Sequence, residues 1–275
     1  MTKLQKFLAN RGPAEMYEAC WVPCTLWPFA VALAEVANPS DHVLDAGAGT
    51  GLLTDLAAAR VGARGHVTAL DPTPFMQEIL HRKFDGAPRI SVIEGTVEEA
   101  ELPDDSFDTL LCHQVVQYVG DLPSAFAEMR RVLKPGGVLA IGVWSGTADQ
   151  SAAALEEGFR AHLGEDFAPI HAWSFGGLDR LRTLAEAAGF SIERLEKEVR
   201  TARFASVEHL MNVHITGGMR VADGQVLMGI FDLDDASFEP KVDRLLEDLT
   251  MALAGYETPW GLAIPWASDV LVARA

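Results

Sequence analysis

The stretch VLDAGAGTG at residues 43–51 places one carboxylate and three glycines where they could form a binding site. Asp45 is followed by glycines at positions 47, 49 and 51. Glycine permits left-handed backbone angles and the close approach of a ligand, whereas a carboxylate repels phosphate and attracts a cation such as an ammonium or a sulfonium. The stretch therefore predicts a turn that binds a positively charged ligand, and a plain tight turn is the alternative.

This turn does not fit two common nucleotide-binding motifs. A dinucleotide fingerprint, G-x-G-x-x-G, would need a glycine at position 52, where the chain has Leu52. A phosphate-binding loop would need a lysine followed by serine or threonine, and the turn has neither pair. The glycine turn therefore favours some other nucleoside over one that presents a pyrophosphate.

A second carboxylate, Asp71, ends the apolar stretch VTALD. In dinucleotide-binding folds a carboxylate at this position accepts hydrogen bonds from the ribose hydroxyls. The simpler alternative is that Asp71 and Pro72 form a turn and cap the next helix. Together with the glycine turn, Asp71 predicts that the ligand carries a ribose.

The elements that would position these residues alternate between short apolar strands and amphipathic helices. Strands are predicted at 42–46, 66–70, 90–93, 107–112, 137–143, 191–204 and 261–274, and helices at 52–61, 74–84, 124–133, 149–163 and 178–188. The sequence KPGG at 134–137 is expected to stop a helix and turn into the next strand. Such alternation is typical of a parallel sheet with helices on both faces. The ligand of such a sheet binds beyond the carboxyl ends of its strands, where the glycine turn falls.

The whole chain, residues 1–275, is predicted to form one domain with two additions to its core. The core comprises 40–204 and 259–275, and the additions are an N-terminal helical piece, 1–39, and a mostly helical insertion, 205–258. Pro28 is expected to kink or divide the N-terminal piece. Because both additions stand apart from the regular alternation, they are the candidates for a lid over the site.

The charge of the chain disfavours several classes of partner. Its 22 lysines and arginines stand against 39 acidic residues, for a formal net charge of −17. Nucleic acids and anionic membranes are bound through clustered basic side chains, so we expect neither as a partner. The longest apolar run, 22–37, is broken by prolines and too short to span a bilayer. The N-terminus lacks the apolar segment of a signal peptide, so we expect a cytoplasmic protein with a small-molecule substrate.

Neither the cysteines nor the acidic residues predict a metal site. The chain has 3 cysteines, which make no disulfide framework. Cys20 and Cys24 would share a helix face, but no second pair accompanies them as a metal site would need. The acidic sequence ELPDDS at 101–106 lies in a predicted loop and is expected to be solvated.

Four blocks of this sequence resemble the class I S-adenosylmethionine-dependent methyltransferases. They are VLDAGAGTG (43–51), VTALDPTPFM (67–76), IEGTVEEAELPDDSFDTLLCHQVVQYV (93–119) and MRRVLKPGGVLAIGVW (129–144). The branch that they resemble is bacterial, acts on small molecules and is related to the ubiquinone and menaquinone biosynthesis methylases. The resemblance implies a doubly wound α/β fold with a mostly parallel seven-stranded, Rossmann-like sheet. It also implies methyl transfer to a small-molecule acceptor, at oxygen most often and at carbon or nitrogen otherwise, in secondary or cofactor metabolism.

The resemblance further implies which residues hold S-adenosylmethionine. Asp45 and the backbone of Gly47 and Gly49 would hold the methionine end. Asp71 would hold the ribose, and Met76 would pack on the adenine. The full set of implied cofactor-binding residues is Asp45, Gly47, Ala48, Gly49, Gly51, Asp71, Pro72, Met76, Thr96, Val97, Cys112 and His113.

At the adenine the chain departs from the family. Thr96 and Val97 would face the adenine edge, but the family more often has an acid in the position of Thr96. The contact to the adenine amino group would then come from the Thr96 hydroxyl or from Glu98. Cys112 and His113 end the fourth strand and would lie beside the reacting sulfonium.

The methyl group of S-adenosylmethionine is already activated, so a methyltransferase needs mainly to align donor and acceptor and to exclude water. A hydroxyl or carbon acceptor also needs a base, and His113 is the catalytic candidate because it follows the strand that carries the cofactor wall. The residues predicted to face the substrate or to close as a lid are Tyr17, Trp21, Gln117 and Trp144, and Gln114 is a candidate for orienting the substrate beside Gln117. S-adenosylhomocysteine would be the product, and no metal is expected. A second copy of the chain, in a homodimer, is one candidate partner.

One alternative keeps the cofactor but not the methyl transfer. Some proteins of this fold use bound S-adenosylmethionine as a structural element and catalyse a rearrangement or a cyclisation. Release of S-adenosylhomocysteine distinguishes the two activities.

Overall fold

The structure is a computed structural model of the whole chain, and it describes residues 13–145, 150–163, 175–217, 219–222, 225–228 and 239–275. Its contacts divide the chain into two compact units. The sheet unit comprises 27–145, 175–198 and 268–275, and the second unit comprises 1–26, 146–174 and 199–267. The expected division into a single domain with a core and two lid pieces stays a prediction.

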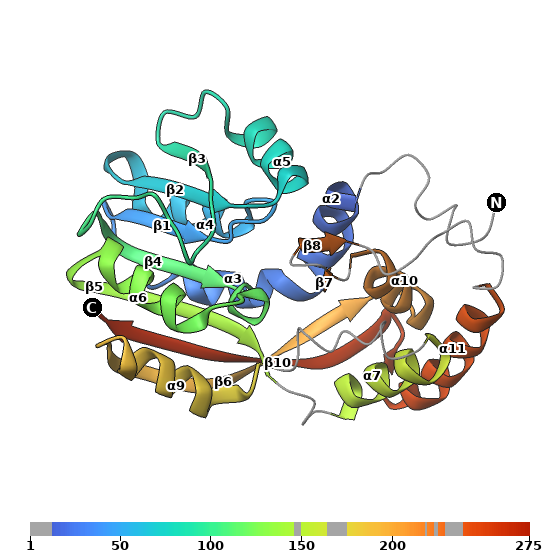
Figure 1. Cartoon of the computed structure of the whole chain (residues 1–275). Helices are drawn as coiled ribbons and strands as arrows, with labels where there is room; N and C mark the ends of the chain where they lie inside the picture. The colour runs from blue at the N-terminus through green and yellow to red at the C-terminus, as the bar shows by residue number, and fades with distance from the viewer. Residues whose placement is uncertain (1–12, 146–149, 164–174, 218, 223–224, 229–238) are drawn as a thin grey trace. The chain divides into compact units, whose positions relative to one another are not determined.

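The main sheet of the described chain has seven strands in one path and a short eighth strand beside it (Figure 1). The order is β3-β2-β1-β4-β5-β10-β6, and β9 pairs with β10. The strands are β1 (His42–Ala46), β2 (His66–Asp71), β3 (Ile90–Glu94), β4 (Phe107–His113), β5 (Leu133–Trp144), β6 (Ser191–Phe204), β9 (Glu257–Thr258) and β10 (Gly261–Arg274). Neighbours among β1 to β5 pair in parallel, whereas β10 runs antiparallel to β5. The doubly wound, mostly parallel sheet is thus confirmed, and its order reverses between β1 and β4, where such sheets bind ligands.

Helices of the sheet unit pack on the strands in two groups. They are α3 (Trp27–Ala34), α4 (Leu52–Val61), α5 (Pro74–Phe84), α6 (Leu122–Val132) and α9 (Gly177–Ala187), with short 3-10 helices η2 (Gly62–Arg64) and η3 (Val116–Tyr118). α3 contacts α4, β4 and β5, and α4 contacts β1 and β2. α6 contacts β5 and α9.

Side-chain alternation along β1 shows that these groups cover opposite faces of the sheet. The side chain of Asp45 is directed to α4, where it contacts Thr54. Its neighbours Leu44 and Ala46 belong to the core cluster that α6 builds with Phe126 and other apolar residues. Because successive side chains of a strand point to opposite faces, α4 and α6 lie on different sides of β1, which therefore carries an acid on one face of an otherwise apolar strand.

β5 begins earlier than the sequence predicted. At KPGG, 134–137, we expect a turn, but α6 is followed directly by β5, which begins at Leu133. Leu133 pairs with Phe107, and the register shifts after this pair. The two glycines exchange backbone hydrogen bonds of 2.9 Å with Ala275. The expected start of the strand at 137 was wrong, but the backbone is irregular at 134–137 as the expected turn requires, because the pairs with β4 jump from Leu133 to Val138 and Gly136 has a φ of 78°.

The second unit is mainly helical in its described part. Its elements are α2 (Pro13–Met16), η1 (Tyr17–Leu26), α7 (Gln150–Leu163), α10 (Val207–Gly217), β7 (Met219–Ala222), β8 (Gln225–Met228), α11 (Glu239–Ala252) and η5 (Ala254–Tyr256). α7 packs against α11, and α10 packs against α2 and η1. The helices of the predicted insertion are present, but the antiparallel hairpin of β7 and β8 was not predicted.

The N-terminal helical piece changes type near Pro28, as expected. η1 is a π-helix that contains Pro23, and the α-helix α3 begins at Trp27. Pro28 therefore lies in the first turn of α3, where its missing N–H is not needed. The division between the two units falls at the same point, between 26 and 27.

Two strands contribute residues to both units. Within β6 the division falls between 198 and 199, and within β10 it falls between 267 and 268.

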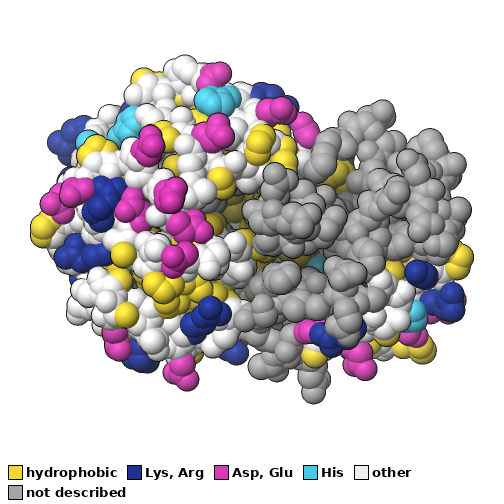
Figure 2. Space-filling view, viewed as in Figure 1, with side chains coloured by type: hydrophobic (Ala, Val, Ile, Leu, Met, Phe, Trp, Pro, Cys, Tyr) yellow, Lys and Arg dark blue, Asp and Glu magenta, His cyan; other side chains and the backbone are white. Residues whose placement is uncertain are grey.

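Acidic and basic side chains are interspersed on the face of the sheet unit that Figure 2 shows. Over the described ranges, every helix is too short or too polar to cross a bilayer.

Candidate functional site

The glycine turn follows β1 and has three glycines with positive φ, at Gly47, Gly49 and Gly51. A Cβ at Gly47 would lie 2.2 Å from Val115 Cγ2, and one at Gly51 would lie 2.5 Å from Phe84 Cε2. A Cβ at Gly49 would meet nothing within 4 Å. The outer glycines are therefore required by packing within the protein, whereas Gly49 faces open space that a ligand can approach.

The backbone of this turn is tied to the end of β2. The N–H groups of Gly47 and Ala48 both donate to the Leu70 carbonyl oxygen, at 2.8 and 2.9 Å. Because these donors are engaged, the turn can bind a ligand mainly through its carbonyl oxygens, which accept hydrogen bonds. Acceptors of this kind suit an ammonium group and do not suit a phosphate.

Asp71, at the end of β2, is buried and faces the turn. Its Oδ2 accepts from the Gly49 N–H at 2.8 Å, and its Oδ1 accepts from the Thr73 N–H at 2.9 Å. Burial raises the pKa of Asp71, although the hydrogen bonds from Thr73 and Gly49 act in the opposite direction. The bond from the Thr73 N–H forms the local turn that the simpler interpretation of Asp71 expects. The bond from the Gly49 N–H joins the two predicted ligand-binding segments.

Asp45, at the end of β1, is 1% exposed. Its Oδ2 accepts from Thr54 Oγ1 at 2.6 Å. Burial raises the pKa of Asp45 to about 7, the Thr54 hydrogen bond opposes this, and the nearby Asp71 raises it further. In the described chain no salt bridge reaches either carboxylate. Burying acids without a cation is costly, so this end of the sheet is suited to a positively charged ligand.

His113 ends β4 and is half-buried, with its Nε2 enclosed. That atom has no hydrogen-bond partner among the described residues. Burial lowers the pKa of His113 to about 3, so the imidazole is neutral at pH 7. An imidazole with so low a pKa is a weak base, which weighs against the predicted catalytic role but leaves Nε2 available for a hydrogen bond with a ligand.

Gln114 and Gln117 extend this end of β4 into a polar network. Gln117 Nε2 donates to Gln114 Oε1 at 3.2 Å, and Gln114 Nε2 donates to Ser268 Oγ at 3.3 Å. Gln114 has a φ of 60°, in the left-handed region that non-glycine residues seldom adopt. Gln117 Oε1 is buried and lacks a partner in the described chain. Backbone strain beside unsatisfied polar atoms is typical of ligand-binding positions.

Cys112 precedes His113, and its side chain lies on the other face of β4. It is fully buried in the core cluster with Phe126 and Met129 of α6. Burial raises the pKa of its thiol, so the sulfur is unreactive. The structure therefore places the Cys112 side chain in the core, and only its backbone is at the end of the strand with His113.

The side chains predicted to reach the adenine amino group make other contacts. Thr96 Oγ1 accepts from the Glu99 N–H at 3.2 Å, and Glu98 Oε1 accepts from the Gly120 N–H at 3.3 Å. Each oxygen can still accept a second hydrogen bond, so neither prediction is decided. Both side chains nevertheless stabilise the loop after β3.

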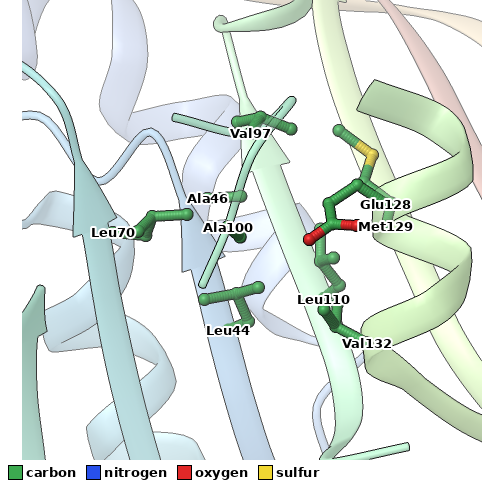
Figure 3. Close-up of a pocket in the computed structure, with 9 residues that line it drawn as sticks. All are labelled: Leu44, Ala46, Leu70, Val97, Ala100, Leu110, Glu128, Met129 and Val132. Atoms are coloured by element: carbon green, nitrogen blue, oxygen red, sulfur yellow. The ribbon is translucent and has the colours of Figure 1, made fainter. Parts of the chain in front are cut away.

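The other residues predicted around the adenine differ in exposure. Met76 is buried on α5, and Pro72 is exposed. Val97 is buried and lines a small cavity between the sheet and α6, together with Leu44, Ala46, Leu70, Ala100, Leu110, Glu128, Met129 and Val132 (Figure 3). The space in this cavity amounts to about 10 Å³, roughly what one water molecule needs. It is therefore a packing defect of the core and not the nucleoside site.

The residues predicted to face the substrate are divided between the units. Gln117 and Trp144 belong to the sheet unit, and Tyr17 and Trp21 belong to the second unit. Trp144 is 3% exposed and packs edge-on against Phe29, with ring centroids 5.6 Å apart. It therefore contributes to the core, and the structure does not bring these four residues together within one unit.

Sequence reasoning missed one residue of this site. Thr54 is the partner of Asp45, and its position in the first turn of the helix after the glycines is the signal that could have found it. Gln114 was a sequence candidate for orienting the substrate, but its left-handed backbone was not predicted, because Gln114 N–H donates to the Gly142 carbonyl oxygen in β5, which is distant in sequence. In the described chain, no three His, Cys, Asp or Glu side chains are grouped as a metal site would require.

Known proteins share both the sequence and the fold. A family model described as a methyltransferase domain matches residues 44–141. A demethylmenaquinone methyltransferase of Listeria monocytogenes is 31% identical over 171 residues, which cover 56% of this chain and 71% of that protein. A malonyl-[acyl-carrier protein] O-methyltransferase of Serratia marcescens is 33% identical over 175 residues, which cover 64% of this chain and 62% of that protein. The chain thus spans less than two thirds of the Serratia relative.

A solved methyltransferase structure shares the fold at lower sequence identity. Phosphoethanolamine N-methyltransferase 2 of Haemonchus contortus, solved in complex with S-adenosyl-L-methionine, superposes with a TM-score of 0.56. The two are 15% identical, and the alignment covers 100% of this chain and 60% of that one. The matched methyltransferase domain contains the glycine turn and both acids. Together with the sequence relatives, it shows that the chain belongs to the S-adenosylmethionine-dependent methyltransferases.

Proposed function

We propose that this chain transfers the methyl group of S-adenosylmethionine to a small-molecule acceptor. The observation that carries the proposal is the pairing of two buried carboxylates, Asp45 and Asp71, with the open turn at Gly49. S-adenosylmethionine fits these groups because it has an ammonium and a sulfonium for the carboxylates and two ribose hydroxyls as donors. The bonds from the backbone leave Asp71 with further acceptor sites for those hydroxyls.

The remaining predicted contacts complete the cofactor site. Asp45 would interact with the methionine ammonium, directly or through the carbonyl oxygens of the turn. Met76 and Pro72 would lie on the adenine side, with Thr96 at the adenine edge. The backbone at Gly51, Ala48, Val97 and Cys112 would complete the wall.

Methyl transfer needs little besides positioning at this site. The bound cofactor supplies a methyl group on a positively charged sulfur, which needs no further activation. The chain would align the acceptor and exclude water. With its low pKa, His113 would accept a hydrogen bond from the acceptor at Nε2 and would not remove its proton at neutral pH.

The names of the relatives support a small acceptor. The Listeria relative is named for demethylmenaquinone and the Serratia relative for malonyl groups on a carrier protein. We propose oxygen as the acceptor atom, and a cytoplasmic enzyme that acts without a metal. Because the relatives are named as methyltransferases, they do not favour the alternative of a rearrangement or cyclisation. A homodimer and the closure of Tyr17 and Trp21 over the site stay predictions.

Calorimetric titration with S-adenosylhomocysteine tests the cofactor site. The unaltered protein should bind it, and it should not bind NAD. Asp71→Ala should weaken binding by about 100-fold, since each hydrogen bond to a charged group contributes about 1.5–3 kcal/mol. Asp85→Ala is the matched control, because Asp85 is an exposed acid of the same unit whose carboxylate pairs with the imidazole of His81.

Equal affinity of the Asp71→Ala and Asp85→Ala variants, with both folded, would overturn the assignment of the ribose site. Binding without release of S-adenosylhomocysteine from S-adenosylmethionine, over a panel of hydroxylated acceptors, would leave the cofactor site in place and contradict the proposed acceptor class.

A further inference from the structure

His214 is a buried histidine of the second unit that the cofactor site does not use. It lies on α10, is 2% exposed and contacts the Leu210 carbonyl oxygen through Nδ1 at 2.8 Å. A carbonyl oxygen only accepts hydrogen bonds, so Nδ1 carries the proton in the neutral ring. Nε2 is then a bare acceptor, and it has no partner among the described residues.

Four aromatic rings surround this imidazole within the second unit. Trp21 packs edge-on, with ring centroids 4.6 Å apart and planes at 84°. The centroids of the other three rings lie 5.7 Å (Trp266), 6.2 Å (Phe159) and 6.3 Å (Phe204) from that of His214. All four side chains are buried. These separations are those of interacting aromatic pairs, so the imidazole is part of one aromatic cluster.

The rings come from segments that are far apart in the sequence. They lie on η1, on α7, and in the portions of β6 and β10 that belong to the second unit. Of these, η1 is a ten-residue π-helix. π-helical geometry is rare and occurs frequently at functional sites, so the backbone that carries Trp21 is a second indication of a site here.

An acceptor atom enclosed by carbon is costly for a folded protein. Most buried side-chain polar atoms in folded proteins have a hydrogen-bond partner, so Nε2 is a candidate to bind a donor group. Burial also lowers the pKa of His214 to about 4, so at pH 7 the ring is neutral and Nε2 can only accept. A neutral hydrogen-bond donor would therefore satisfy Nε2, and the surrounding aromatic rings favour a donor group on a planar, apolar molecule.

We propose that His214 and its four aromatic neighbours, the His214 cluster, bind a planar aromatic compound whose hydroxyl donates to Nε2. The proposal goes beyond the proposed function and does not depend on it. Trp21 would then contact the ring of this compound. Since Nε2 is enclosed, the entering hydroxyl displaces the side-chain atoms that now cover it.

Binding of 2-naphthol to the full-length protein tests this site without methyl transfer. Its control is 2-methoxynaphthalene, which has the same rings but no donor. The naphthol should bind about tenfold more tightly, the ratio that one buried hydrogen bond produces. It should also move the Nε2 resonance of His214 in a two-dimensional proton–nitrogen NMR spectrum of the imidazoles, whereas the methoxy compound should not.

Two variants separate the hydrogen bond from the aromatic walls. His214→Phe keeps an aromatic ring in the cluster and should bind both compounds equally. His162→Gln is the control, because His162 belongs to the same unit but contacts Asp248 near the surface. This variant should keep the tenfold preference.

Equal binding of the two compounds by the unaltered protein would overturn the proposal, and this holds even if His214→Phe does not fold. A preference retained in folded His214→Phe would also overturn it. Calorimetry with S-adenosylhomocysteine is independent of both results. Cofactor binding without naphthol discrimination would contradict only the His214 cluster, and the reverse pattern would contradict the proposed function.

Discussion

The glycine turn of the sheet unit and the His214 cluster of the second unit bury ionisable groups of opposite kinds. Burial raises the pKa of Asp45 to about 7 and lowers that of His214 to about 4. In both places the neutral form is favoured for the same reason, because a charge loses its water. The two regions differ in what would offset this cost. Two neighbouring acids are stabilised by a cation, whereas a neutral imidazole among aromatic rings is stabilised by a neutral donor.

The largest effect should come from filling the open space at the turn. Gly49→Ala puts a methyl group where the ligand would approach, and overpacking costs about 1–3 kcal/mol. S-adenosylhomocysteine should therefore bind up to about 100-fold more weakly by calorimetry. Gly86→Ala is matched to it, since Gly86 also has a positive φ and nothing within 4 Å of a Cβ. Gly86→Ala should lose a similar amount of stability but no affinity for S-adenosylhomocysteine. Equal losses of affinity in the two variants would show that backbone strain, and not a blocked ligand, weakens binding.

The pH dependence of binding should differ between the two regions. Asp45 must be ionised to bind a cation, and its pKa is about 7. Affinity for S-adenosylmethionine should therefore fall by about tenfold from pH 8 to pH 6, the change that one proton taken up below pH 7 requires. Affinity for 2-naphthol should stay constant over this range, because His214 remains neutral. In Asp45→Asn the cofactor affinity should be lower and flat with pH, and a retained slope would assign the proton elsewhere.

The smallest effect should be on stability. The pKa of Asp45 in the folded state lies above the ordinary value of 3.8, so ionisation destabilises the fold as pH rises from about 4 to about 7. Asp45→Asn should then unfold at a higher temperature at pH 8, by about 2–4 °C for each kcal/mol removed, and at an unchanged temperature near pH 4. Asp85→Asn should show no such gain. A lower midpoint for Asp45→Asn at pH 8 would mean that the ionised form is already well satisfied.

Much of the sheet unit could be predicted because its signals are local. α5, β6 and β10 were predicted with the bounds that the structure shows, since each is a periodic segment that ends at residues which stop helices or strands. The proximity of the glycine turn and Asp71, which the Gly49 hydrogen bond shows, could be predicted for a similar reason. Parallel strands place their carboxyl ends at one edge, so position in the sequence gives position in the site.

The rest depends on contacts that no local pattern reveals. The start of β5 is set by pairing with residues distant in sequence, and the left-handed backbone of Gln114 is set by β5. His214 was one histidine among several in the insertion. It becomes notable only when rings from four separate segments surround it. The role of Asp45 in holding the cofactor stays a prediction, and its raised pKa could not be predicted because it depends on burial.

The passage of β6 and β10 through both units has a consequence for how the protein can be dissected. Neither unit is one uninterrupted length of polypeptide, because the chain changes unit within each of these strands. Trimming from either terminus therefore removes parts of one unit without releasing the other intact. A protease cut at a single bond would not separate them into independent pieces either. The two proposed ligand sites are best distinguished by single substitutions in the whole protein, each with a matched control in the same unit.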